Sequence, residues 1–452
     1  MDEGSLIHDS ETQELSKKHS MNKGRNRLCN LPDVVLQHIL SFLGTKEAVR
    51  TSVLSKKWQY VWVSIPNLNF IQGAGTIYDR ALFMNLVERA LVLRKSLSIQ
   101  KLSLSCNVLC DACRINSWVF GAVRHKVQVL DLCLFLNEES FVLPRSLFTC
   151  ESIKVLNLQM CYNLRLPSSI FFPSLKILTL KHVIFPDDQS TQQLFSGCPV
   201  LEELTLDDCY WENIKAISIS APMLKSLVIY DFLDVKSHCQ VIIFGMSLKS
   251  FVYEGRLKND YCLCNTSSLV DACILVDERH LASAYHANKL IKELSNVESL
   301  VLTPQTVEAL SYREEFLAQL PKFLNLTHLE LCVDFADMAS GALMKVFQNS
   351  PCLTSLEFNG GIELTREDWT LDPVPPCFLT HLKTIKIVDF LGTGEEVLVV
   401  RSLLRNTAVL EKLVIFWSEE FSGQGDFQKQ KAVNDDLLAL PKGSQNCVIS
   451  FS

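Results

Sequence analysis

The chain has 452 residues, a formal net charge of −7 and 48% hydrophobic residues. A net negative charge opposes a general attraction to nucleic acid, so we do not expect a DNA or RNA partner. The first 27 residues contain no apolar segment, and no uninterrupted apolar run approaches the roughly 18 residues of a membrane-spanning helix. We therefore expect neither a secretory leader nor a membrane anchor.

Seventeen cysteines are present, and many lie inside apolar patterns, as Cys133 does in LDLCLFL and Cys332 in LELCV. In a reducing compartment a buried cysteine behaves as a small apolar side chain. We therefore expect reduced cysteines and a location in the nucleus, the cytoplasm or both.

Residues 1–25 are polar and rich in Ser, Lys and Glu, a composition typical of a disordered tail. A loose basic cluster near its end consists of Lys17, Lys18, Lys23, Arg25 and Arg27. Two interpretations of this cluster stay open, a nuclear-import signal and a solvated basic tail.

Residues 26–70 predict three short helices. Pro32 suits the first turn of a helix because it lacks the N–H that is unpaired there, and Asp33 places negative charge at the positive end of the helix dipole. Gly44 provides the end of this first helix. The apolar residues at helical spacing between them are Leu36, Ile39, Leu40 and Leu43.

The second and third helices follow Thr45 and Ser55, two residue types that cap helix N-termini. Their apolar residues are Val49, Val53, Leu54, Trp58, Val61 and Trp62. Domains of this size bury only about 60% of the surface that the unfolded chain exposes. Part of this apolar surface is therefore expected to dock a partner.

The run LPDVVLQHILSFL followed by AVRTSVLSKKWQYVW resembles the F-box, the motif that attaches substrate receptors to cullin-based ubiquitin ligases through a Skp-type adaptor. The resemblance implies that residues 26–70 bind the adaptor. The residues it places on or beside the adaptor surface are Leu31, Pro32, Leu36, Ile39, Leu40, Leu43, Val53, Leu54 and Trp58. The alternative is an ordinary three-helix core with no docking role.

Beyond residue 70 the sequence repeats one pattern, apolar residues at positions i, i+3 and i+5. Successive copies are between 22 residues apart, from Ile153 to Leu175, and 29 residues apart, from Val297 to Leu326. The copies begin at Ile99, Val127, Ile153, Leu175, Leu201, Leu224, Leu248, Val270, Val297, Leu326, Leu353, Leu382 and Leu410. Those at Ile99, Leu248 and Val270 are poor matches, so the register is least certain there.

This period and pattern are typical of leucine-rich repeats, in which each unit lays one strand into a parallel ladder and returns by an irregular or helical segment. The inward side chains of each strand stack on those of neighbouring units, so no unit is stable alone. The sequence therefore predicts an α/β fold, with an N-terminal three-helix F-box followed by a leucine-rich-repeat solenoid over residues 71–374.

Because side chains alternate along a strand, the residue between the last two apolar positions of each copy is expected to point into the concave face. These residues are Ser103, Asp131, Asn157, Thr179, Thr205, Val228, Val252, Ile274, Val301, Glu330, Glu357, Lys386 and Val414. The early ones are small and polar, and the middle four are apolar.

We interpret the apolar stretch as a substrate groove, because an exposed apolar patch on a polar ladder often marks a binding surface. Tyr230 and Tyr253 at neighbouring positions enlarge it. The predicted groove consists of Val228, Tyr230, Val252, Tyr253, Ile274, Val301, Glu330 and Glu357. The alternatives are that a loop such as 257–268 covers the patch, or that β-branched residues simply suit strands.

The segment PPCFLTHLKTIKIVDFLGTGEEVLVVRSLLRNTAVLEKLVIF, with the terminal NCVISFS, resembles the FBD region of many plant F-box proteins with leucine-rich repeats. It covers residues 375–452. GTGEEVLVVRSLLRN predicts a helix with an apolar face of Val399, Leu403 and Leu404. We expect this FBD-like α/β segment to extend and cap the solenoid, with a polar loop at 418–436.

No catalytic or metal-binding constellation is evident. Cys106, Cys110 and Cys113 form one cluster and Cys262 and Cys264 another, but neither has a second ligand pair at zinc-finger spacing. The sequence also lacks an H-E-x-x-H, a G-x-S-x-G or a Gly-rich phosphate-binding motif. We expect no metal, no cofactor and no catalytic residue.

The resemblance to F-box proteins implies a non-catalytic substrate-recognition subunit of an SCF-type (Skp, cullin, F-box) ubiquitin ligase. The F-box would bind the adaptor and through it a cullin, and the repeats would hold an unidentified target, raising its effective concentration near a ubiquitin-charged enzyme.

Two alternatives to this function stay open. One is a protein-binding scaffold that does not deliver its partner for degradation. The other is a receptor that needs a small ligand to complete the groove; it ranks lower because the groove has no basic cluster for an acidic ligand.

Overall fold

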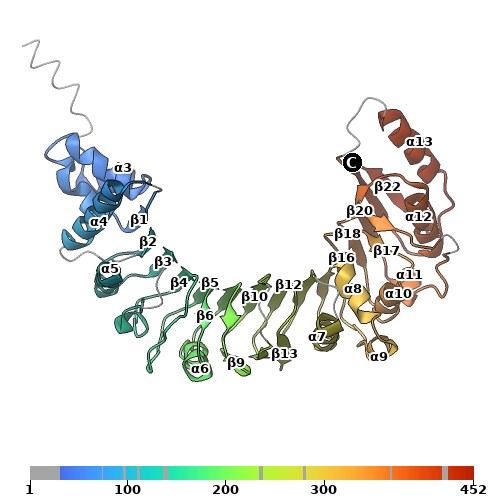
Figure 1. The fold of residues 1–452 in the computed structure, drawn as a ribbon. Helices are drawn as coiled ribbons and strands as arrows, with labels where there is room; N and C mark the ends of the chain where they lie inside the picture. Colours follow the sequence, from blue (N-terminus) through green and yellow to red (C-terminus); the bar gives the residue numbers. More distant parts are fainter. Residues whose placement is uncertain are drawn as a thin grey trace, which may run out of the picture. The chain divides into compact units, whose positions relative to one another are not determined.

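The structure is a computed structural model of the chain. It describes residues 31–73, 75–94, 98–108, 112–135, 141–233, 238–277, 281–366, 369–419 and 426–452. The chain divides into two compact units, the first ending at Met160 and the second running from Cys161 to Ser452, and Figure 1 labels their elements. The predicted tail at 1–25 and the basic cluster of Lys17, Lys18, Lys23, Arg25 and Arg27 lie outside the described residues.

The first unit begins with short helices, as the sequence predicts. These are α2 (Asp33–Ser41), α3 (Thr45–Arg50) and the 3-10 helices η2 (Thr51–Val53) and η3 (Trp58–Ser64). Pro32 is the N-cap of α2 and Asp33 lies in its first turn. The predicted third helix is the 3-10 helix η3, whose N-cap is Lys57 rather than Ser55.

The predicted capping role of Thr45 is wrong. Gly44 is the N-cap of α3, and Thr45 is its first helical residue and is buried. The Thr45 hydroxyl instead accepts a hydrogen bond from the backbone N–H of Asn69, at 2.7 Å. This bond ties α3 to strand β1 (Asn67–Ile71), which the sequence analysis did not predict as a strand.

A parallel strand ladder with helices makes up the rest of the first unit. Its further elements are β2 (Lys101–Asn107), β3 (Val129–Phe135), β4 (Val155–Met160), α4 (Ile77–Val92), α5 (Ala112–Arg124) and the 3-10 helix η4 (Arg145–Leu147). The strands pair in the order β1–β2–β3–β4. Leu68, Leu102, Leu130 and Leu156 share one register position and are all buried, so they form one layer of the core.

The second unit contains a longer parallel ladder. Its strands, in spatial order, are β5 (Ile177–Lys181), β7 (Glu203–Asp207), β10 (Ser226–Asp231), β12 (Ser250–Gly255), β14 (Asp271–Val276), β15 (Ser299–Leu302), β16 (His328–Leu331), β18 (Ser355–Phe358), β20 (Thr384–Phe390), β21 (Lys412–Trp417) and β22 (Val448–Phe451). Each predicted copy from Leu175 to Leu410 falls at one of the first ten strands, with the copy at Val270 one residue out of register, so the predicted solenoid is confirmed. Strand β22 extends the ladder beyond the predicted copies.

Short strands also form in the segments that return from one ladder strand to the next. They are β9 (Ala216–Ser220), β11 (Gln240–Phe244) and β13 (Asp260–Cys264) in one parallel sheet, β6 (Ile184–Phe185) with β8 (Tyr210–Trp211), and β17 (Ala336–Asp337) with β19 (Ile362–Glu363). The proposed covering loop at 257–268 therefore contains a strand, β13. Tyr261 and Leu263 of β13 are buried, so this segment belongs to the core of the returns.

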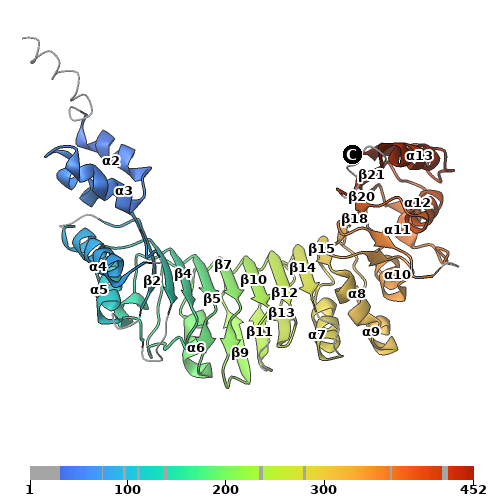
Figure 2. The same cartoon turned by 45° about the horizontal axis from the view of Figure 1, so that its top comes forward.

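Helices occupy the other returns. They are α6 (Asp188–Ser196), α7 (Leu281–Lys292), α8 (Pro304–Leu310), α9 (Glu314–Ala318), α10 (Gly341–Gln348), α11 (Pro376–Thr380), α12 (Gly394–Asn406) and α13 (Asp426–Leu438). Figure 2 shows α6 and α7 along the same side of the ladder as β9 and β13, and each helix contacts one of those strands. The opposite face of β5–β16 carries the outward-pointing side chains, and we call it the open face.

The C-terminal part of the second unit contains the predicted helix, with one correction beyond it. Helix α12 begins at a capping box in which Thr393 and Glu396 bond each other's backbone N–H, and Val399, Leu403 and Leu404 are buried as predicted. The polar stretch expected to be a loop contains α13 instead. Leu437 of α13 is fully buried and Val433 is half-buried, so this side of the helix packs against the unit.

Candidate functional site

The F-box helices divide the nine predicted adaptor-binding residues between the core and the surface. Leu36, Leu40 and Trp58 are buried, because α2 packs against η3. Leu31 is half-buried, and the five exposed members are Pro32, Ile39, Leu43, Val53 and Leu54. The buried three can shape the surface only through the fold, whereas the exposed five are free to touch a partner.

Further exposed apolar side chains on α2 were missed by the sequence analysis. Val34 and Phe42 are 74% and 77% exposed, and Val35 is also exposed. The ring of His38 packs edge-on against Phe42, with the centroids 4.9 Å apart. Val34, His38 and Phe42 are four residues apart and so line one side of the helix. The spacing of these three residues is visible in the sequence, although the predicted apolar stripe ran through Leu36 and Leu40.

Lys57 ties the start of α2 to the start of η3. Its Nζ donates a hydrogen bond to the backbone carbonyl of Leu31 at 2.5 Å and lies 3.4 Å from a carboxylate oxygen of Asp33. The bond fixes the segment that carries Leu31 and Pro32. An apolar surface held on a rigid frame loses little conformational freedom when it docks.

In the second unit, one row of side chains crosses the open face at a shared register position. The row runs Thr179, Thr205, Val228, Val252, Cys273, Val301, Glu330, Glu357, Lys386, Val414 and Ser450. Val228, Val252, Val301, Glu330 and Glu357 therefore lie where the sequence placed them, half-exposed between buried neighbours. Their role in binding stays a prediction.

Two predicted groove residues are wrong, Tyr253 and Ile274. Both side chains are fully buried and point into the core. In β14 it is Cys273 that pairs with Val252 on one side and Val301 on the other. The true copy is thus Leu269, Ala272 and Ile274, and starting it one residue late reversed the facing of every side chain in the strand.

The corrected apolar patch comprises Val228, Tyr230, Val252, Cys273, Leu275 and Val301. An ion pair lies further along the ladder on each side. Lys181 lies 2.8 Å from Asp207, and Lys386 lies 3.1 Å from Glu357. Between these pairs the outward positions are mostly apolar, with Glu254 between Tyr230 and Leu275 and Glu330 next to Val301.

The thiols of Cys273 and Cys332 on this face both have raised pKa values. Burial raises the pKa of Cys273 to about 12, with Cys332 and the carboxylates of Glu254 and Glu330 adding to the effect. Burial and the same two carboxylates raise the pKa of Cys332 to about 11. A thiol attacks only as its thiolate. Both therefore act as small apolar side chains at neutral pH.

A buried polar cluster closes the end of β10. Oδ2 of Asp231 accepts hydrogen bonds from Tyr253 Oη, Asn259 Nδ2 and Tyr261 Oη, each at 3.3 Å. Burial raises the pKa of Asp231, and these three donors only partly oppose that effect. The cluster joins β10 and β12 of the ladder to β13 of the second sheet, which is a structural role.

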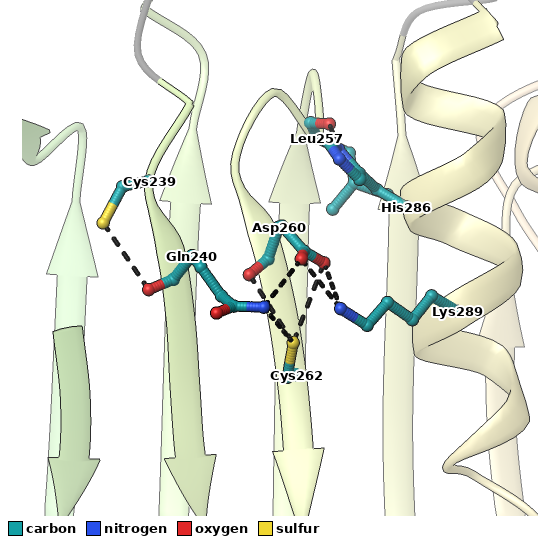
Figure 3. Close-up of polar contacts among 7 residues, drawn as sticks. All are labelled: Cys239, Gln240, Leu257, Asp260, Cys262, His286 and Lys289. Atoms are coloured by element: carbon teal, nitrogen blue, oxygen red, sulfur yellow. Dashed lines mark hydrogen bonds and ion pairs between the residues drawn. The ribbon is translucent and has the colours of Figure 1, made fainter. Parts of the chain in front are cut away.

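A second polar cluster lies on the opposite side of the unit from the open face, where β11, β13 and α7 meet. Figure 3 shows Lys289 extending from α7 toward Asp260, with Nζ 2.8 and 2.7 Å from the two carboxylate oxygens. Gln240 donates to Asp260 at 3.2 Å. Burial alone raises the pKa of Asp260, but Lys289 and Gln240 outweigh it and the net pKa is lowered. The arrangement anchors α7 to β13.

The cysteine clusters do not assemble into a metal site in the part of the chain that the structure describes. Cys106 is buried in β2 and Cys113 is exposed, and Cys110 lies outside the described residues. Cys262 and Cys264 are half-exposed on β13. No group of three or more His, Cys, Asp and Glu side chains among the described residues is placed to hold a metal ion.

Among the described residues, no helix combines the length and apolar character that crossing a bilayer requires.

The parallel ladder of repeated strands is typical of a leucine-rich-repeat protein, and the short helices with an exposed apolar surface that precede it in the chain fit an F-box. Two family models agree: residues 28–70 match the F-box domain, and residues 90–434 match the model described as At1g61320/AtMIF1, LRR domain.

Relatives from Arabidopsis thaliana extend this match over most of the chain. The putative FBD-associated F-box protein At3g50710 is 31% identical, over 93% of this chain and 99% of its own length. The F-box/FBD/LRR-repeat protein At5g56420 is 28% identical, over 94% of this chain and 99% of its own length. The chain belongs to the family of FBD-associated F-box proteins with leucine-rich repeats.

Proposed function

We propose that this protein is the non-catalytic, substrate-recognition subunit of an SCF-type ubiquitin ligase. The observation that carries the proposal is the exposed apolar surface of the F-box helices, with Val53 86% and Phe42 77% exposed. Exposed apolar groups on a small helical module are typical of a docking site for another protein. The partner proposed for this site is a Skp-type adaptor, and through it a cullin.

The exposed residues Pro32, Ile39, Leu43, Val53 and Leu54 contact the adaptor in this proposal, together with the newly found Val34, Val35 and Phe42. The buried residues Leu36, Leu40 and Trp58 hold the helices in place beneath them. Large apolar side chains at the centre of an interface carry most of its binding energy.

The proposal also assigns the binding of the target protein to the repeats. The apolar patch of the open face is the candidate contact surface, because it gathers half-exposed apolar side chains on neighbouring strands. The chain itself transfers no ubiquitin. It raises the concentration of the target near a charged enzyme of the ligase, and this proximity alone accelerates the transfer.

The experiment is affinity purification from plant cells under proteasome inhibition, followed by ubiquitination in a reconstituted assembly. The chain is compared with a Leu31→Ala, Pro32→Ala variant and a Val53→Glu, Leu54→Glu variant. Val92→Glu, which changes an exposed residue of α4, is the matched control.

We expect both F-box variants to lose adaptor and cullin while keeping other captured proteins, and those proteins to be ubiquitinated only by the intact assembly. Adaptor binding without ubiquitination of any captured protein would favour a scaffold that does not deliver its partner for degradation. A fluorescent fusion in the same cells tests the expected nuclear or cytoplasmic location.

A further inference from the structure

The open face of the second unit carries a charge pattern that narrows the chemistry of the target. We propose that the apolar patch binds a short segment of the target in which apolar side chains are interspersed with Lys or Arg. This inference rests on the proposed function, because it assigns a class of segment to the same surface.

The apolar part of the segment follows from the patch itself. Val228, Val252, Cys273 and Val301 succeed one another at one register position, and Tyr230 and Leu275 lie beside them on the same face. Neighbouring strands lie about 4.8 Å apart, so the row from Val228 to Glu330 spans about 19 Å across five strands. An extended segment of about six residues covers that distance.

The basic part follows from the charges around the patch. On β10, β12, β14, β15 and β16, all of whose residues the structure describes, the half-exposed and exposed side chains include three carboxylates, Glu254, Asp271 and Glu330, and no Lys or Arg. Glu254 and Asp271 make no side-chain hydrogen bond or ion pair with any described residue. A carboxylate at the rim of an apolar patch favours a cation on the partner.

Glu330 has polar neighbours but no permanent counter-charge. Asn359 Nδ2 donates to it at 2.5 Å, and Nε2 of His328 lies 4.0 Å from its carboxylate. Among the neighbouring cations, Lys181, Lys225 and Lys386 are already engaged by Asp207, Glu202 and Glu357. Lys249 and Arg256 flank β12 at its two ends, outside the outward-facing strand positions. The negative charge of Glu254 and Glu330 on the strands themselves is therefore left for a partner to neutralise.

The raised pKa values of Cys273 and Cys332 reflect the same negative charge on this face. Glu254 and Glu330 both raise the pKa of Cys273 and of Cys332, so the two carboxylates act on one area of the face from different strands. No basic side chain contributes to either pKa shift. An acidic segment or a nucleic-acid backbone would be repelled here, which leaves a basic and apolar protein segment as the occupant that fits.

The test measures binding of synthetic peptides to the purified full-length chain by fluorescence anisotropy. Three pools of twelve-residue peptides alternate Val, Leu or Ile with Lys or Arg, with Ser or Thr, or with Asp or Glu. We expect the basic pool to bind about tenfold more tightly than the neutral pool, the acidic pool to bind least, and added salt to reduce the difference.

Variants separate this site from a general attraction to an acidic protein. Glu254→Lys, Glu330→Lys should weaken basic-pool binding by about tenfold, and Val252→Ser, Val301→Ser should weaken binding of both the basic and the neutral pools. Glu293→Lys, Glu315→Lys, at exposed positions after α7 and on α9, is the control with the same change in net charge and should have a smaller effect than the double variant on the open face.

Equal binding of the three pools, no binding of any pool, or equal loss with the control would overturn the inference. The assay contains neither adaptor nor ubiquitin. A failed preference alongside successful target ubiquitination would therefore reject the segment class and leave the proposed function standing.

Discussion

The hydroxyl of Tyr253 lies 3.3 Å from Oδ2 of Asp231, and this buried contact lies at the end of strand β10, where the sequence predicted Tyr253 as an exposed binding residue. The same hydroxyl accepts a hydrogen bond from the backbone N–H of Leu257 at 2.6 Å. Tyr253 thus connects β10 to the turn that leads into the second sheet. Its aromatic ring serves the core, and the target surface must be built without it.

Replacing Asp231 tests this connection. Asp231→Leu leaves the two tyrosine hydroxyls and Asn259 Nδ2 without their buried acceptor, and each unsatisfied donor costs about 1–3 kcal/mol. We expect the free energy of unfolding to fall by at least about 2 kcal/mol, measured by urea denaturation. An unchanged urea midpoint would show that the cluster contributes nothing to stability.

The pH dependence of Asp231→Asn gives a second test of this cluster. Because the pKa of Asp231 is raised above 3.8 in the folded state, its contribution to stability is fully present below pH 3.8 and is lost as the pH rises through the folded-state pKa. Asparagine does not ionise, so the variant does not lose this stability as the pH rises. Its stability relative to the wild type should therefore rise between pH 4 and pH 7, and a constant difference would contradict the raised pKa.

A pair of neighbouring substitutions tests the corrected register of β14. Ile274→Glu places a charge in the core and should destabilise the chain by more than about 3 kcal/mol. Cys273→Glu adds the same charge at a half-exposed position and should leave the melting temperature within a few degrees of wild type. If Cys273→Glu were the more destabilising of the two, the register described here would be wrong.

Removing the positive charge of Lys289, which anchors α7, should cause a smaller loss of stability, and this loss should depend on pH. Lys289→Met keeps the aliphatic stem but removes the partner of Asp260, and should destabilise by about 1 kcal/mol, since both side chains are partly exposed. The folded-state pKa of Asp260 is lowered, so its contribution is present above pH 3.8 and is lost as the pH falls through the folded-state pKa. Thermal melts should show the difference at pH 7 and not at the acid end.

The repeated strands were predictable because each copy places two or three large apolar residues at fixed spacing. Leu201, Leu204 and Leu206 are all buried, and Thr205 between the last two faces outward, as the pattern requires. The ladder core needs no information from distant residues. Its period and its strands could therefore be read directly from the chain.

The register at β14 could not be fixed in the same way. The stretch LVDACILV fits the pattern from Leu269 and also from Val270, because Ala272, Cys273 and Leu275 are all acceptable at inward positions. Only pairing with Val252 and Val301 selects Cys273 as the outward residue. The choice is made by tertiary contacts between strands, which a local pattern does not contain.

The second sheet was missed for a related reason. Residues 216–220 and 240–244 alternate in burial like ladder strands, but they lie in the variable part of the repeat, whose length changes between copies.

The F-box was predictable as a motif, but its exposed surface was not. Its motif was recognised, but only the structure separates the buried Leu40 from the exposed Val53.

The most direct measurement is the affinity of the full-length chain for a purified Skp-type adaptor by isothermal titration calorimetry. The wild type is compared with Val53→Glu, Leu54→Glu and with the control Val92→Glu, all at exposed positions. The account predicts a loss of at least about 30-fold, near 2 kcal/mol, for the double variant, with unchanged melting temperature and full binding by the control. Equal affinity of the double variant and the wild type, or no binding by the wild type, would contradict it.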